Sequence, residues 1–383
     1  MTNSTYFPID KLKEGETPLY YYDLHLLDET LDAVKAAASY PNFHVHYAVK
    51  ANSNPEILQR IAAAGLGADT VSLGEIKAAV TAGFPAPKIV FAGVGKTDAE
   101  ITTALQYGIG CFNVESKAEL EVIESLAAEM GVKAPVALRV NPEIDAHTHH
   151  YITTGLAENK FGIAMTMIDE LVDYCIKSES LDFRGFHFHI GSQVTDLTPF
   201  KILCERINSL QERLPDIEIP LINVGGGLGI DYDNPDSNPI PDFKSYFDIF
   251  HENLKLRPGQ QLHFELGRAI VAQCGSLITR VVYVKEGVGK KFVIVDGGMT
   301  ALIRPALYQA HHKIENITSN SDIEERYDVV GPICESSDVF GTDEPLPLTK
   351  RGDLIALRSA GAYGEIMASG YNCRPLPGSV FSR

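Results

Sequence analysis

The chain has 383 residues, of which 45% are hydrophobic and 22% are charged, an ordinary composition for a globular protein. Its formal net charge of −17 argues against nucleic acid or an anionic membrane as the main partner. No apolar run reaches the ~20 residues of a membrane span, and residues 1–10 lack the basic and apolar regions of a signal peptide. The six cysteines are scattered without a C-x-x-C pair, which favours a reducing, cytoplasmic location.

The region from residue 43 to residue 266 alternates between short β-branched or apolar runs and stretches with helical period. Strands are predicted at residues 44–49, 68–71, 88–92, 110–114, 135–140, 183–189, 220–224 and 261–265. Eight strands separated by helices predict a (β/α)8 TIM barrel. An open doubly wound sheet is the alternative, but no G-x-G-x-x-G follows the first strand. Polar residues also fall at the C-terminal ends of several strands, where barrel enzymes place their chemistry.

The remainder of the chain shows strands with little helical period. They are predicted at residues 276–285, 291–296, 328–334 and 353–359. This pattern indicates a second domain, resembling a β-sandwich or β-barrel, which an early strand at residues 19–22 could join. We therefore predict a barrel at residues 25–270 and a discontinuous β domain formed by residues 1–24 and 271–383.

Two residues in the first predicted strands could supply a reactive amine and a carboxylate that orients it. Lys50 ends the first predicted strand, so it would point towards the barrel mouth, where a partly desolvated lysine can form a Schiff base with a carbonyl. Asp69, in the second strand, could orient this amine. A solvated loop lysine and an aspartate in a local hydrogen bond are the structural alternatives.

Later strands carry further polar residues. His187 and His189 alternate in the sixth strand, so period two places both on one face, for a structural role, metal binding or stacking on a planar ligand. Glu265 ends the eighth strand and could bind a metal, act as a base or pair with a protonated ring nitrogen. Arg268 could simply be its ion-pair partner. Cys334 lies among polar residues, which is unusual for a buried hydrophobic cysteine.

A triple glycine, residues 225–227, follows the seventh predicted strand. Glycines let backbone N–H groups approach an anion closely, and this part of a barrel is a common phosphate site; a flexible turn is the alternative. A lysine, a stacking histidine, a phosphate loop and a carboxylate at one barrel mouth fit pyridoxal phosphate.

The motifs at residues 47–52, 187–192, 225–227, 265–268 and 334–338, in this order, make the sequence similar to the diaminopimelate decarboxylases. These enzymes belong to the alanine-racemase-like pyridoxal phosphate enzymes, together with ornithine, arginine and carboxynorspermidine decarboxylases. The similarity extends over essentially the whole chain. Departures at Leu266, where proline is usual, and at Leu73, where a small residue is usual, affect loop geometry rather than chemistry.

This resemblance implies decarboxylation of meso-2,6-diaminopimelate to L-lysine, the last step of bacterial lysine biosynthesis, with pyridoxal 5'-phosphate and without a metal. It also implies a cytoplasmic homodimer in which Cys334 and Glu335 reach the partner's cofactor. The implied catalytic residues are Lys50, His189, Glu265 and Cys334. The implied cofactor contacts are Lys50, Asp69, His189, Ser192, Gly225, Gly226, Gly227, Glu265, Gly267, Arg268 and Tyr371. The implied substrate contacts are Arg268, Arg304, Tyr308, Glu335 and Tyr371.

Three alternatives remain open: a carboxynorspermidine decarboxylase, a catalytically silent homologue that binds the cofactor, and a barrel lyase without pyridoxal phosphate. Two arginines, Arg268 and Arg304, suit a distal carboxylate, and Glu335 suits a distal ammonium. Ornithine has no distal carboxylate, so this pair favours diaminopimelate over ornithine.

Overall fold

The computed structural model describes residues 7–144 and 160–382. They divide into a barrel unit, residues 30–144, 160–229 and 242–270, and a sheet unit, residues 7–29, 230–241 and 271–382. The first six residues of the predicted β domain and most of the loop expected after the fifth barrel strand lie outside the described residues. In the part that is described, no helix is long and apolar enough to cross a membrane.

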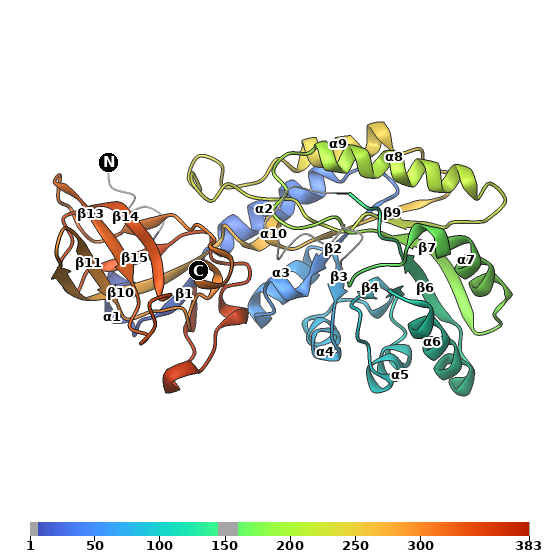
Figure 1. Cartoon of the computed structure of the whole chain (residues 1–383), viewed down its shortest axis with the longest axis horizontal. Helices are drawn as coiled ribbons and strands as arrows, with labels where there is room; N and C mark the ends of the chain where they lie inside the picture. Colours follow the sequence, from blue (N-terminus) through green and yellow to red (C-terminus); the bar gives the residue numbers. More distant parts are fainter. Residues whose placement is uncertain (1–6, 145–159, 383) are drawn as a thin grey trace. The chain divides into compact units, whose positions relative to one another are not determined.

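The barrel unit is a closed ring of eight parallel strands (Figure 1), which confirms the predicted TIM barrel. The strands are β2 (Phe43–Ala48), β3 (Gly67–Thr70), β4 (Ile89–Phe91), β5 (Cys111–Val114), β6 (Ala134–Arg139), β7 (Leu181–His187), β8 (Leu221–Asn223) and β9 (Gln261–Leu266). β9 pairs with β2 and closes the ring. Small and branched side chains fill its interior, among them Val90, Cys111, Ala137 and Leu221.

Helices surround the ring because each buries one apolar stripe. In α7, Ile168, Leu171, Val172 and Cys175 are buried, which is the i, i+3, i+4, i+7 spacing of an amphipathic helix. The helices are α2 (Leu24–Ala37), α3 (Pro55–Ala63), α4 (Leu73–Ala82), α5 (Asp98–Tyr107), α6 (Lys117–Met130), α7 (Ile168–Lys177), α8 (Thr198–Arg213), α9 (Phe243–Asn253) and α10 (Arg268–Val271). Short 3-10 turns occur at Val49–Ala51, Ala86–Lys88 and Met165–Met167.

The sheet unit is built on a mixed sheet in the order β12-β15-β10-β11-β13-β14. Its strands are β1 (Leu19–Tyr22), β10 (Gly275–Glu286), β11 (Lys291–Val295), β12 (Ile314–Asn316), β13 (Glu324–Val330), β14 (Val339–Pro347), β15 (Leu354–Leu357) and β16 (Gly378–Phe381). Its helices are α1 (Ile9–Glu14) and α11 (Arg304–Tyr308), with 3-10 turns at Glu365–Met367 and Tyr371–Cys373. The early strand β1 pairs with β10 and β16, which confirms that residues 19–22 join this sheet.

Several predicted strand ends differ from the observed ones, and three of these differences concern candidate site residues. The strand expected at residues 328–334 ends at Val330. At Gly331 the chain turns close to Asp338, where a Cβ would lie only 2.3 Å from Asp338 Oδ2. β2 stops before Lys50, which lies in the following 3-10 turn. β7 stops at His187, so His189 is not in the strand. The pattern also missed β12, β14 and β16.

Candidate active site

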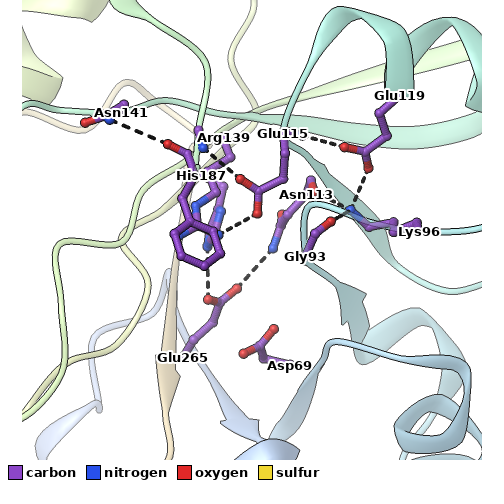
Figure 2. Close-up of polar contacts among 12 residues, drawn as sticks. Asp69, Gly93, Lys96, Asn113, Glu115, Glu119, Arg139, Asn141, His187 and Glu265 are labelled. Atoms are coloured by element: carbon purple, nitrogen blue, oxygen red, sulfur yellow. Dashed lines mark hydrogen bonds and ion pairs between the residues drawn. The ribbon is translucent and has the colours of Figure 1, made fainter. Parts of the chain in front are cut away.

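Glu265 is the most heavily hydrogen-bonded carboxylate in the barrel interior (Figure 2). Its Oε1 accepts from Asn113 Nδ2 at 3.1 Å and its Oε2 lies 3.0 Å from His187 Nε2, as Figure 2 shows. Its Oε1 also accepts from Asn223 Nδ2 at 2.7 Å. Burial by itself raises the pKa of Glu265, but His187 and the charge of Lys50 outweigh it, so the pKa lies below its ordinary value. The site therefore contains a fixed negative charge at neutral pH.

Lys50 lies beside a second buried carboxylate. Its Nζ is 3.1 Å from Asp69 Oδ2, and the Asp69 side chain is fully buried. Burial and the nearby charge of Glu265 raise the pKa of Asp69 to about 6, against the opposing effect of Lys50. The amine thus has a close acceptor at the end of β3, as the sequence pattern suggested.

The two histidines do not act as a same-face pair. His187 is buried against Glu265, whereas His189 lies beyond the strand end and its Nδ1 accepts a hydrogen bond from the Gly226 amide at 3.2 Å. Burial, with the charges of Arg139 and Lys50, holds the pKa of His189 well below its usual value. His189 therefore presents a neutral ring.

The triple glycine is packed too closely for any side chain. A Cβ at Gly226 would lie 1.9 Å from the Glu265 carbonyl oxygen, and one at Gly225 would lie 2.3 Å from the Phe188 carbonyl oxygen. Gly225 donates to Asn223 Oδ1 at 2.9 Å, and Gly226 donates to His189. Within the described part of the chain, the Gly227 amide has no acceptor, so it is the loop donor that an anion would meet.

Arg268 and Ser192 lie side by side in the same unit. Arg268 Nη2 donates to Ser192 Oγ at 2.9 Å, so Arg268 is not the ion-pair partner of Glu265 that sequence proximity allowed. Gly267, one residue earlier, packs against the turn that carries Lys50: its Cβ would lie 3.0 Å from Ala51 Cβ and 3.1 Å from Ala48 Cβ.

A second layer of buried charges, which the sequence pattern did not single out, is shown in Figure 2. Arg139 Nη1 lies 2.6 Å from Glu115 Oε1, and Lys96 Nζ lies 2.6 Å from Glu119 Oε1. The Glu115 amide donates to Glu119 Oε2 at 2.7 Å, which links the two pairs. Arg139 and Glu115, like Asn113 and Asn223, stand at or just beyond strand C-termini, so the rule that singled out Glu265 could have found them.

The other predicted site residues belong to the sheet unit. Cys334 and Glu335 are exposed in the turn after β13. Asp338 orders this turn by accepting from the amides of Ile333 at 2.7 Å and Met299 at 2.6 Å. Tyr371 donates to Glu335 Oε1 at 2.6 Å.

Two more predicted substrate contacts, Arg304 and Tyr308, occupy the two ends of α11. The predicted site residues are thus divided between the two units. The barrel unit brings together Lys50, Asp69, His189, Ser192, Gly225, Gly226, Gly227, Glu265, Gly267 and Arg268.

The barrel residues fit pyridoxal phosphate on three observations. Asp69 Oδ1, Asn113 Oδ1 and His187 Nδ1 are buried atoms without a hydrogen-bond partner among the described residues, an arrangement typical of sites that bind polar ligands. The same unit also carries the Lys50 amine next to Asp69, the neutral ring of His189, and the Glu265 carboxylate next to Asn113 and His187. The donors at Ser192 and Arg268 suit a phosphate.

Comparison with known proteins agrees with this chemistry. The family model described as pyridoxal-dependent decarboxylase, pyridoxal binding domain, matches residues 28–272. A diaminopimelate decarboxylase from Bacteroides thetaiotaomicron is 63% identical over 374 residues, which cover 97% of each chain. A solved diaminopimelate decarboxylase from Helicobacter pylori, complexed with L-lysine, has a TM-score of 0.93 at 40% identity and covers 98% of this chain and 94% of that one.

A lysine/ornithine decarboxylase from Vibrio vulnificus, complexed with putrescine, shares the fold alone, with a TM-score of 0.86 at 22% identity over 100% of this chain and 99% of that one. The barrel, its fixed carboxylate and lysine, and the extent of the sequence match agree with one another. The chain therefore belongs to the pyridoxal-dependent decarboxylase family, in the branch that contains the diaminopimelate decarboxylases.

Proposed function

We propose that the protein decarboxylates meso-2,6-diaminopimelate to L-lysine and CO2. The observation that carries this proposal is a barrel site with a fixed Glu265 carboxylate and a Lys50 amine, in a chain 63% identical to a diaminopimelate decarboxylase. Bound pyridoxal 5'-phosphate supplies the electron sink for the charge that loss of CO2 leaves at Cα. The residues of this chain hold the cofactor, orient the substrate and deliver the proton.

The barrel geometry supports the following proposed cofactor contacts. The Lys50 amine would hold the cofactor aldehyde, with Asp69 accepting a hydrogen bond from the amine. His189 would lie against the ring, and its low pKa supports this role because a neutral imidazole adds no positive charge beside the cofactor. Glu265 would keep the cofactor nitrogen protonated by electrostatic attraction.

We assign the phosphate to the other side of the same mouth. Ser192, Arg268 and the Gly227 amide donate to it, and the close packing of Gly225 and Gly226 shapes the loop. Gly267 allows the Lys50 turn to pack against the end of β9. From the sheet unit, Tyr371 approaches the cofactor.

Substrate recognition needs cations for a carboxylate and an anion for a distal ammonium. Arg268 and Arg304 suit the carboxylate, because a guanidinium can bind it through two parallel hydrogen bonds. Glu335 suits the distal ammonium, and its hydrogen bond with Tyr371 supports a fixed orientation. Tyr308 adds a further contact.

Cys334 is the proposed proton donor to Cα. Its exposed position in a turn that buried Asp338 orders supports this assignment, since a donor must reach the substrate and be held in place. The electron pair of the broken bond to CO2 would form a C–H bond at Cα with this proton, and the resulting thiolate would regain a proton from solvent.

We further propose that the enzyme is a cytoplasmic homodimer, with the barrel at residues 25–270 and a β domain of residues 1–24 and 271–383 that contributes to substrate binding and dimerisation. Cys334 and Glu335 then complete the partner's site. Inactive Lys50→Ala and Cys334→Ala chains, mixed and refolded together, should recover about a quarter of wild-type activity, because half of the dimers hold one intact site of two. No recovery contradicts shared sites.

The direct test is turnover of diaminopimelate and carboxynorspermidine by the purified protein, with and without added pyridoxal phosphate. We expect lysine formation that depends on the cofactor. Turnover of carboxynorspermidine alone contradicts the proposed substrate.

Cys334→Ala should lower kcat at least about tenfold while the visible absorbance of the bound cofactor remains. Cys373→Ala, the other exposed cysteine of the sheet unit, is the matched control and should stay near wild type. Equal losses in both variants would remove Cys334 from the mechanism.

A further inference from the structure

Residues 230–241 occupy an unexpected place in the molecule. In the chain they stand between the glycine loop and α9 of the barrel, but they cluster with the sheet unit. They form neither helix nor strand. Their position must therefore come from side-chain contacts with the sheet unit.

A partly buried charge cluster around the buried Arg358 holds this 230–241 segment. Arg358, only 5% exposed, has Nη2 2.7 Å from Asp236 Oδ1 and Nη1 2.7 Å from Glu315 Oε2. Lys313 Nζ lies 3.6 Å from Asp236 Oδ2 and 3.1 Å from Glu315 Oε1. Gln273 Nε2 also donates to the Asn238 carbonyl oxygen at 2.5 Å. The cluster fixes the segment at both its side chains and its backbone.

Tyr232 connects the segment to Arg304. Arg304 Nη1 donates to the Tyr232 hydroxyl oxygen at 3.2 Å, and the guanidinium carbon lies 5.2 Å from the centre of the Tyr232 ring. The edge-on ring of His312, 5.2 Å away, supports Tyr232. His312 in turn is fully buried and donates from Nδ1 to the Arg358 carbonyl oxygen at 2.9 Å.

Arginine has many rotamers, so a site that must bind a carboxylate gains affinity when the guanidinium is held in place beforehand. We propose that Tyr232 is a positioning residue that orients Arg304 for the distal carboxylate of the substrate. This proposal rests on the proposed function. It predicts that Tyr232 affects ligands with a distal carboxylate and spares the diamine that lacks one.

The test compares Tyr232→Phe, which removes the hydroxyl acceptor and keeps the ring, with wild-type holoenzyme. We expect KM for diaminopimelate and the inhibition constant of L-lysine to rise roughly three- to tenfold, with kcat within about twofold. L-lysine keeps the carboxylate that survives the reaction, whereas cadaverine (1,5-diaminopentane) has none, so the cadaverine inhibition constant should not change. Tyr232→Leu, which also removes the ring, should raise KM roughly thirtyfold.

The matched control is Tyr283→Phe. Tyr283 is an exposed tyrosine of β10 whose ring centre lies 5.1 Å from the Arg351 guanidinium carbon, a similar pair to which we assign no role in the site. In the Arg304→Ala background, Tyr232→Phe should change KM less than about twofold, because the residue it positions is gone.

Three results would overturn the inference: an unchanged KM in Tyr232→Phe, an equal loss of cadaverine binding, or an additive effect in the Arg304→Ala background. If wild-type enzyme does not convert diaminopimelate, the proposed function fails separately. Calorimetric titration of L-lysine and cadaverine then still decides whether Tyr232 acts on carboxylate binding.

Discussion

Replacement of Glu265 by glutamine keeps the shape of the most heavily hydrogen-bonded carboxylate in the barrel and removes its charge. Three donors, on Asn113, Asn223 and His187, lie 2.7 to 3.1 Å from its oxygens. Each of these three hydrogen bonds weakens by about 1 kcal/mol when its acceptor loses the charge. Part of this loss is offset because the folded protein no longer buries a charged group. We expect a net loss of about 1–2 kcal/mol in the free energy of unfolding.

The functional loss in Glu265→Gln should be much larger than the loss of stability. Without a fixed carboxylate at the cofactor nitrogen, kcat should fall about a hundredfold. The assay is lysine formation at saturating cofactor, with bound cofactor followed by its visible absorbance. Glu124→Gln is the control: Glu124 of α6 accepts from the Tyr174 and Ser178 hydroxyls, so it should lose similar stability and keep its kcat. A kcat of Glu265→Gln within about threefold of wild type refutes the electrostatic argument.

Three further variants test the barrel site. Gly226→Ala places a Cβ 1.9 Å from the Glu265 carbonyl oxygen and should abolish tight cofactor binding; an unchanged cofactor titration contradicts this. Arg139→Met leaves Glu115 as a buried unpaired charge and should cost about 3–5 kcal/mol in urea unfolding, and replacing both residues by methionine should recover much of the loss. If Arg139→Met is as stable as the variant with both residues replaced, an unpaired Glu115 charge is not the cause of the loss. Because the pKa of Asp69 rises to about 6 on folding, its contribution to stability is complete below its ordinary pKa and is lost as pH rises through 6. Wild type should therefore lose roughly 2 kcal/mol of unfolding free energy relative to Asp69→Asn between pH 4 and pH 7. A difference between the two proteins that does not change with pH would contradict this linkage.

The strands of the barrel could be predicted because each is a short apolar run between helices with clear amphipathic spacing. Errors arose where the apolar pattern continued past the true strand end. The run of residues 328–334 continues through Gly331, whose close contact with Asp338 turns the chain, and contacts of this kind depend on residues seven or more positions away. Likewise, His189 continues the alternation of β7 but is held by Gly226 from the next strand's loop.

The sequence by itself determined which residue types stand at the strand ends, and therefore that a lysine, a carboxylate and a glycine loop would meet at one barrel mouth. Only the tertiary structure decided their partners. Arg268 is three residues from Glu265 in the chain. In the closed barrel, however, Glu265 forms its hydrogen bond with His187 from β7, and Arg268 donates to Ser192.

The same holds for the 230–241 segment, which barrel periodicity assigned to the barrel. Its ion pair between Asp236 and Arg358 joins residues 122 positions apart in the chain. Local propensity specifies an element, but pairing between charges that are distant in the chain is settled only when the folded chain brings them together.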